Sequence, residues 1–166
     1  MGWRRAVLVA IHAVGRMKAG AEQELAARYL DRFAKSGPAV GLEFSGVLEI
    51  AEGRSQSADE RRRDEAGRLR AQMAKGAALI ALDERGKNIA SADLAQKIGD
   101  MRDGGRRNLA FAIGGPDGLD PGFRGEADVA LSFGLLTWPH QLVRVMLAEQ
   151  LYRIATILAG HPYHRP

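Results

Sequence analysis

Three short segments of this sequence carry residue types suited to holding a small molecule, and each follows an apolar stretch. They are Leu82-Asp83, the glycine-rich turn Gly114–Gly118, and the apolar run Phe133–Trp138 before Pro139. Adjacent glycines let a ligand approach the backbone closely, because no Cβ atom intervenes. An apolar loop that presents backbone N–H and C=O groups can bind an adenine ring and exclude water around it. We therefore expect a small-molecule site here; a purely structural turn and a core-crossing connector are the alternatives.

A second set of residues has the chemistry to bind RNA. His140 and Arg144 lie one helical turn apart, and the chain closes with the aromatic and basic tail His161–Arg165. Imidazole, phenol and guanidinium groups stack on bases and bind phosphate. The alternatives are a capping role for His140, a weak zinc pair in the tail, and a frayed terminus. From these residue types we expect the tail to face RNA.

The charge of the chain also favours a polyanionic partner. Lysine and arginine number 24 against 20 acidic residues, which gives a net charge of +4 and a pI of about 9.8. Cationic side chains attract phosphates and release their counterions. The runs Arg61-Arg62-Arg63 and Arg106-Arg107 are weaker candidates for phosphate contacts. The first run is most simply a solvated helix face.

Several classes of protein are disfavoured by what the sequence lacks. The chain has no cysteine, which excludes disulfides, thiolate zinc sites and cysteine nucleophiles. It has neither the dinucleotide-binding glycine fingerprint after its first apolar stretch nor a P-loop, which weighs against oxidoreductases and ATPases. The apolar run Ala6–Ile11 after Met1–Arg5 is too short for a signal peptide, and no run of 18 apolar residues occurs. We expect a cytoplasmic protein.

Apolar stretches with strand character alternate with segments of helical periodicity along the whole chain. This alternation predicts one domain over residues 1–166, a parallel α/β sheet with helices on both faces. In such sheets ligands bind beyond the carboxyl ends of the strands, where the three candidate segments fall. The strands are expected at Ala6–Val14, Leu42–Ile50, Ala77–Leu82, Leu109–Ile113 and Val129–Phe133, and the helices at Ala21–Ala34, Ala58–Met73, Ser91–Met101, Phe123–Glu126 and Pro139–Leu158.

Some finer features follow from local residue types. The segment Leu42–Ile50 is the more polar strand and is expected near a sheet edge. Residues Asp83–Lys87 read as a turn, and Ser91 suits a helix N-cap. Glu149 and Arg153 stand four residues apart, which predicts an ion pair on the last helix.

Five segments together resemble the ribosomal RNA large-subunit methyltransferase H family, which belongs to the SPOUT class of methyltransferases. They occur in order and at family-like spacing across nearly the whole chain. The segments are AVGRMK at 13–18, IALDERGK at 80–87, GGPDGL at 114–119, LSFGLLTWPHQLVRVMLAEQLYRI at 131–154 and HPYHR at 161–165. Departures from the family pattern, at Gly2–Arg5, in the arginine-rich segment Glu52–Asp64 and at Pro166, touch none of the cofactor motifs.

The resemblance implies an S-adenosylmethionine-dependent enzyme that methylates N3 of a pseudouridine in 23S ribosomal RNA, free or within the assembled ribosome. It also implies a homodimer, a carboxy-terminal trefoil knot and no metal. The residues matching the family's cofactor contacts are Leu82, Gly114, Phe133, Gly134, Leu135, Leu136, Thr137 and Trp138. Those matching its substrate side are His140, Arg144, Tyr163, His164 and Arg165.

Methylation at N3 requires loss of the imide proton, so a base or a nearby cation would help. His164 is the first candidate for the base, with Arg165 stabilising developing charge or gripping a phosphate, and His140 is the second. The alternative is that both histidines only position RNA and that solvent removes the proton.

Two rival functions remain at this point. One is a non-catalytic RNA-binding or ribosome-assembly factor. The other is a nucleotide hydrolase, which would need magnesium held by Asp83, Glu84 and Asp117. Because a small catalytic domain offers little surface for folded RNA, we expect a dimer in which the tail of one subunit completes the site of the other. The last helix would then be a scaffold and a dimer surface.

Overall fold

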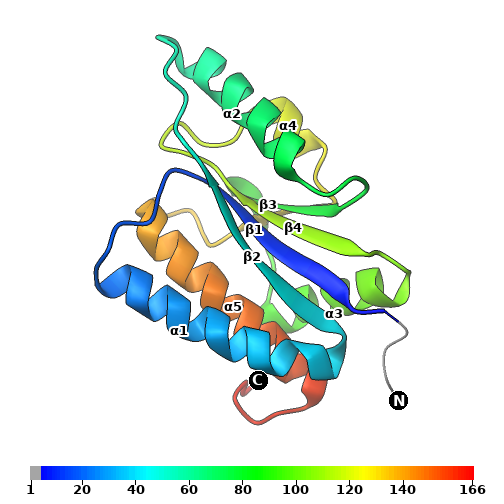
Figure 1. Cartoon of the computed structure of the whole chain (residues 1–166). Helices are drawn as coiled ribbons and strands as arrows, with labels where there is room; N and C mark the ends of the chain where they lie inside the picture. The colour runs from blue at the N-terminus through cyan, green and yellow to red at the C-terminus, as the bar shows by residue number, and fades with distance from the viewer. Residues whose placement is uncertain (1–4) are drawn as a thin grey trace.

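In the computed structural model, which describes residues 5–166, five strands alternate with five α-helices (Figure 1). Of the residues that depart from the family pattern, Gly2 to Arg4 lie outside this range. The strands are β1 Val7–Val14, β2 Leu42–Ile50, β3 Ala78–Asn88, β4 Asn108–Ile113 and β5 Val129–Ser132. The helices are α1 Ala21–Ser36, α2 Ala58–Gln72, α3 Ser91–Asp103, α4 Pro121–Gly125 and α5 His140–Ala159, with a short 3-10 helix η1 at Gly37–Val40.

The strands form a single parallel sheet in the order β2-β1-β4-β3-β5. This confirms the predicted parallel α/β fold. Strand β2 lies at one edge, as its more polar sequence predicted. Because all five strands run the same way, their carboxyl ends meet at one edge of the sheet, and the loops that follow them gather there.

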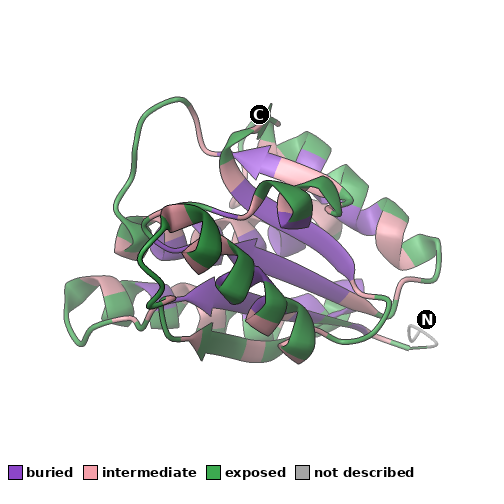
Figure 2. Ribbon diagram, turned by 90° about the horizontal axis from the view of Figure 1, so that it is seen from above, coloured by how far each residue is buried: buried purple, intermediate pink, exposed green. Residues whose placement is uncertain are grey.

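Helices cover both faces of the sheet and enclose two apolar clusters. The larger cluster packs α1, α3 and α5 against one face, with Phe33, Phe111 and Leu147 fully buried in it. The smaller packs α2 and α4 against the other face around Leu69 and Phe123. Figure 2 shows the central strands as buried ribbon between exposed helix surfaces. Burial on both faces explains why the central strands read as unbroken apolar runs. Within residues 5–166, no helix is both long and apolar enough to span a membrane.

Strand β3 is longer than the sequence predicted. After a bulge beyond Leu82 the chain pairs with β5 again, so that Lys87 lies opposite Leu131 and Asn88 opposite Ser132. The predicted turn at residues 83–87 is therefore part of the strand. Its charged, largely exposed residues carry no apolar alternation, and for this reason the pattern gave no sign of it.

The predicted N-cap of α3 was also wrong. The N-cap is Ala90, and Ser91 is already the first helical residue. The Ser91 hydroxyl instead donates to Gln150 Oε1 of α5 at 2.7 Å, a contact between two helices. The remaining predicted element boundaries are exact, as for β2, or differ from the observed ones by at most two residues, as element ends commonly do.

Candidate functional site

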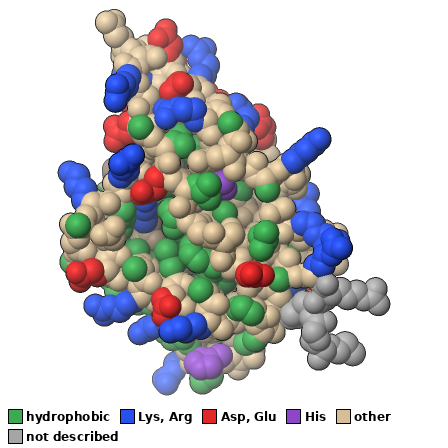
Figure 3. All heavy atoms as spheres, viewed as in Figure 1, with side chains coloured by type: hydrophobic (Ala, Val, Ile, Leu, Met, Phe, Trp, Pro, Cys, Tyr) green, Lys and Arg blue, Asp and Glu red, His purple; other side chains and the backbone are tan. Residues whose placement is uncertain are grey.

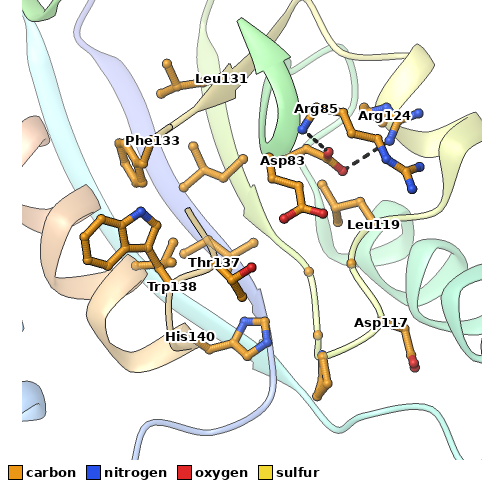
Figure 4. A pocket seen from close by; sticks show the side chains of 18 of the residues that line it. Asp83, Arg85, Asp117, Leu119, Arg124, Leu131, Phe133, Thr137, Trp138 and His140 are labelled. Carbon is orange, nitrogen blue, oxygen red and sulfur yellow. Dashed lines mark hydrogen bonds and ion pairs between the residues drawn. The ribbon is translucent and has the colours of Figure 1, made fainter. Parts of the chain in front are cut away.

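A cavity of about 370 Å³ opens at the bulge of β3 and at the carboxyl ends of β4 and β5. Its walls come mainly from the three segments that the sequence singled out, with His140 and Val143 of α5 closing one side. In Figure 4, Phe133, Thr137, Trp138 and His140 lie along the side formed by the last loop and α5. Asp83 and Arg124 lie across the cavity from them.

The structure brings together seven of the eight predicted cofactor-contact residues. Those that line the cavity are Leu82, Gly114, Phe133, Gly134, Leu136, Thr137 and Trp138. The exception is Leu135, which is 89% exposed and is not among the residues that line the cavity. Leu136 is 70% exposed, so this loop presents apolar surface to solvent at the cavity mouth. Whether these residues hold a cofactor stays a prediction.

The acidic wall of the cavity is held in place by its own contacts. The Asp83 carboxylate accepts from the Arg85 backbone N–H at 2.8 Å and pairs with Arg124 Nη1 at 3.3 Å (Figure 4). The side chain of Asp83 is nearly buried. These two contacts of Asp83 hold the β3 bulge against α4.

The loop after β5 is fastened through a residue that sequence reasoning missed. Ser132 is buried, and its hydroxyl lies 3.0 Å from Gly134 N and 3.3 Å from Glu84 O. Gly134 has φ +115°, a conformation that residues with a Cβ rarely adopt. A serine between an apolar strand and a glycine carries no distinctive pattern, so nothing in the sequence marked this link between β3 and the loop.

The glycines of the turn Gly114–Gly118 allow close contacts within the turn itself, besides the close approach of a ligand that the sequence suggested. A Cβ on Gly114 would lie 2.8 Å from Gly118 C and 2.9 Å from Leu119 N. The turn also closes through Gly118 N–H donating to Gly115 O at 2.9 Å, and Gly118 has φ +82°. Gly114 is therefore required by the close packing of the turn's own backbone, independently of any ligand.

Helix α2 holds this turn from outside. Arg61 binds the Asp117 carboxylate with Nε at 2.7 Å and Nη2 at 3.2 Å, and Arg62 Nη1 donates to Asp117 O at 3.1 Å. The Arg61 guanidinium keeps the pKa of Asp117 below its ordinary value. The prediction that residues 61–63 form a solvated helix face was therefore wrong for two of the three, since only Arg63 is exposed.

A buried carboxyl group of α2 lies against the same turn. Glu65 is 3% exposed, and its Oε2 would be 3.0 Å from a Cβ placed on Gly115. Burial raises the pKa of Glu65, only partly opposed by the Gly53 backbone N–H that donates to it. Together Arg61, Arg62 and Glu65 make α2 the support for one wall of the cavity.

The two residues predicted to face RNA at the start of α5 have different environments. His140 is exposed and lines the cavity. Arg144 is only 8% exposed; it forms an ion pair with Glu49 and donates to Gly15 O at 2.5 Å. Although burial alone would raise it, the pKa of Glu49 is lowered by Arg144 and by the Met17 N–H, which donates to Glu49 Oε2 at 2.7 Å. An RNA contact by Arg144 is untested, but its guanidinium is engaged within the subunit.

The carboxy-terminal tail packs on α5 and is not a frayed end. Tyr163 donates from its hydroxyl to Glu149 Oε1 at 3.1 Å, and His164 Nδ1 lies 3.1 Å from Arg153 Nη1. The predicted ion pair between Glu149 and Arg153 is confirmed at 2.6 Å. Burial, followed by the hydrogen bond to Glu149, raises the pKa of Tyr163 to about 12.

The tail does not reach the cavity of its own subunit. Among residues 5–166, those that line the cavity include none of residues 163–165. From His140 to Glu149, where the tail contacts begin, α5 advances nine residues, about 14 Å at 1.5 Å per residue. The structure thus brings His140 to the cavity and leaves Tyr163, His164 and Arg165 away from it.

A parallel α/β sheet with a glycine-lined cavity of mixed polarity at the edge where its strands end is typical of small-molecule-binding α/β proteins. Residues 7–164 match the family described as "Predicted SPOUT methyltransferase". This match spans nearly the whole chain, and the chain belongs to the SPOUT methyltransferase family.

Relatives at high sequence identity carry one common name. The chain is 71% identical over 157 residues to the "Ribosomal RNA large subunit methyltransferase H" of Mesorhizobium japonicum, covering 95% of this chain and 98% of that protein. It is 61% identical over 159 residues to the protein of that name from Chelativorans sp. (96% and 91% covered), and 60% over 157 residues to that from Brucella anthropi (95% and 98%).

Among solved structures, the chain is similar to the SpoU methyltransferase AviRb of Streptomyces viridochromogenes in complex with AdoMet. That alignment has a TM-score of 0.40 and 13% identity, and it covers 89% of this chain and 60% of AviRb. The similarity to TrmJ from Z. mobilis ZM4 has a TM-score of 0.41 and 14% identity, with 97% and 71% covered.

Proposed function

We propose that this protein transfers the methyl group of S-adenosylmethionine to N3 of a pseudouridine in 23S ribosomal RNA. The observation that carries the proposal is the cavity at the carboxyl edge of the sheet, lined by Leu82, Gly114 and the loop Phe133–Trp138. Membership of the SPOUT methyltransferase family and the name shared by relatives at up to 71% identity support it.

The residues of the cavity fit S-adenosylmethionine in size and chemistry. A volume of about 370 Å³ falls at the lower end of the range for small-molecule sites. The apolar side chains of Leu82, Ile113 and Leu131 offer a dry surface for an adenine ring, and backbone groups of the loop and turn offer polar partners for its edge. When bound, this cofactor supplies a methyl group on a positively charged sulfur.

The chain's own residues would then orient the base and manage its proton. His140 is exposed at the cavity wall, so its imidazole can accept the N3 proton or hold the nucleotide. His164 and Arg165, the first candidates from the sequence, lie along α5 with the tail. In our proposal they act on the cavity of a second subunit.

This arrangement requires a homodimer, which also supplies a longer basic surface for RNA. His140 and Glu149, where the tail contacts begin, are about 14 Å apart along α5. One subunit therefore cannot place its tail and its His140 around the same base without moving the tail. Mixing an inactive His140→Ala protein with an inactive His164→Ala protein tests it. Recovery of activity in the mixture is expected; active wild-type monomers in sedimentation at assay concentration would refute the shared site.

The rival of a non-catalytic RNA-binding factor differs in one measurable property, since it would not bind S-adenosylmethionine. Calorimetry with the cofactor alone separates the two. A hydrolase that holds magnesium on Asp83, Glu84 and Asp117 is less favoured, because Asp83 is paired with Arg124 and Asp117 with Arg61. We therefore propose chemistry without a metal.

The decisive experiment incubates the protein with labelled S-adenosylmethionine and either free 23S ribosomal RNA or assembled ribosomes. We expect label in a single pseudouridine, mapped by primer extension and mass spectrometry of the nucleoside, and the comparison identifies the true substrate. No label in either RNA, despite cofactor binding, would refute the proposed substrate. The proposed setting is the cytoplasm, where ribosomes are found. The trefoil knot implied by the resemblance stays a prediction.

A further inference from the structure

The loop between β1 and α1, residues 15–20, carries two exposed basic side chains at the carboxyl edge of the sheet. Arg16 and Lys18 are both exposed. Within residues 5–166 neither forms an ion pair with an acidic side chain, whereas ten other lysines and arginines do, Arg144 among them. Both side chains are therefore accessible to a partner from outside the subunit, although the charge of Arg16 also contributes to lowering the pKa of Glu49.

The residue between them, Met17, anchors the loop to the body of the protein. The Met17 side chain packs against the cluster of Ala26, Val145 and Ala148 between α1 and α5. Its backbone N–H donates to Glu49 Oε2 at 2.7 Å. Met17 is half-buried against this cluster, whereas Arg16 and Lys18 on either side of it are exposed.

An ion pair between the buried Arg144 and the more exposed Glu49 holds this loop at a second point. Arg144 donates to Gly15 O at 2.5 Å and pairs with Glu49, the same carboxylate that accepts from Met17. Arg144 and Glu49 thus bind backbone groups two residues apart in the loop.

The loop lies close to the cavity, although none of residues 15–20 lines it. Arg144 lies one helical turn after His140, which lines the cavity. On the other side, Val14 at the end of β1 is near the glycine-rich turn, since a Cβ on Gly115 would be 2.9 Å from Val14 Cγ1. Phosphates on either side of a nucleotide in the cavity would lie within reach of long cationic side chains here.

Acidic residues also surround the loop, so charge density alone does not single it out. Glu52 has its Oε1 3.8 Å from a Cβ placed on Gly15, and Glu22 and Glu24 lie in the first turn of α1. Figure 3 likewise shows acidic and basic side chains interspersed over this face of the molecule. What distinguishes Arg16 and Lys18 is that they are exposed on a loop whose backbone is anchored close to the cavity.

We propose that Arg16 and Lys18 bind phosphates of the RNA next to the reacting nucleotide, and that Arg144 and Glu49 are positioning residues for their loop. The inference rests on the proposed function and deepens it. It also gives Arg144 an indirect part in RNA binding, through the loop, in place of the direct contact expected from the sequence.

The test compares Arg16→Ala/Lys18→Ala with Lys75→Ala/Lys97→Ala, which removes the same charge at two exposed positions away from the cavity lining. Affinity for 23S ribosomal RNA and for ribosomes is measured by direct binding over a range of salt. We expect the first variant to lose about 10- to 100-fold in affinity and its log–log salt slope to fall by roughly 0.7–0.9 per lost phosphate contact. The control should change by less than about threefold, with S-adenosylmethionine affinity unchanged in both.

Equal losses in the two variants, or no loss in the first, would overturn the inference. Methylation is assayed in parallel on the wild-type protein. If the wild-type protein binds RNA but methylates nothing, the proposed function fails while the binding comparison still decides this inference. If it binds no RNA at all, both fail.

The positioning role has its own test in Glu49→Gln, a milder change than removing Arg144. The weakened ion pair should loosen the loop and lower RNA affinity, with the loss concentrated in the KM for RNA. Adding Glu49→Gln to Arg16→Ala/Lys18→Ala should cause no further loss, because the side chains that the loop presents are already gone. Independent, additive losses would show that Glu49 acts by another route.

Discussion

Replacing Gly114 with alanine should distort the cavity wall rather than merely fill space. The new Cβ would lie 2.8 Å from Gly118 C, 2.9 Å from Gly118 O and 2.9 Å from Leu119 N. All three neighbours are backbone atoms, so no side chain can rotate away. Ordinary contact begins at 3.4 Å, and the turn must therefore open by about 0.6 Å.

Overpacking of this kind typically costs about 1–3 kcal/mol, and we expect a loss in that range in the free energy of unfolding. Because the displaced turn lines the cavity, affinity for S-adenosylmethionine should fall as well. The unfolding free energy is measured by urea denaturation followed by circular dichroism, and the affinity by calorimetry.

Gly67→Ala is the matched control. Gly67 lies within α2, and a Cβ there would meet no atom within 4 Å. Alanine in the interior of a helix should stabilise the protein by about 0.5–1 kcal/mol and leave cofactor affinity unchanged. A Gly114→Ala protein as stable as the wild type, with the same affinity, would refute the view that the turn's own backbone requires this glycine.

Three further predictions concern pH and capping. Burial raises the pKa of Glu65, so the folded protein keeps this proton to higher pH than the unfolded chain does. Stability is thus fully present below the ordinary carboxyl pKa and declines as the pH rises through the raised value; Glu65→Gln should remove that decline from urea midpoints measured between acid and neutral pH. The pKa of Tyr163 is raised to about 12, so tail packing should weaken as the pH rises through that value. In an ultraviolet titration, Tyr163→Phe should abolish the phenolate signal that develops at the highest pH. Ser57 accepts from Glu60 N at 3.1 Å as the N-cap of α2, so Ser57→Ala should cost about 1 kcal/mol in urea unfolding. An unchanged urea midpoint for Ser57→Ala would show that this N-cap does not stabilise the protein.

Local pattern was enough to predict the strands and most helix limits, because burial on one or both faces fixes where apolar residues fall. Strand β1 and helix α5 are examples. Local pattern missed the extension of β3 to Asn88, which depends on renewed pairing with β5 and not on apolar residues. It misassigned Ser91 for a similar reason, since the hydroxyl's partner is Gln150 on another helix.

The cavity residues were predictable for the same reason as the strands. The three segments predicted from the sequence each follow an apolar stretch of a strand. Parallel strands bring such segments together at one edge of the sheet. The contacts that hold the cavity in shape were not predictable. Arg61 and Asp117 are 56 residues apart, and Arg144 and Glu49 are 95 apart, so no spacing in the sequence relates them. An arginine in a charged run looks solvated until its partner's position is known.

Because of the bulge in β3, the two sides of the cavity are held in place by different numbers of hydrogen-bonded attachments and should differ in flexibility. On the β3 side, residues 83–86 lie between two stretches that both pair with β5, so this wall is clamped at each end. The opposite wall, Phe133–Trp138, is fastened by hydrogen bonds near its start, at Ser132 and Gly134. A clamped wall keeps its shape, whereas a loop fastened at one end opens at lower free energy. Entry and release should therefore take place past Leu136, and amide hydrogen exchange in this loop should slow when the cavity fills while exchange at residues 83–86 stays nearly constant.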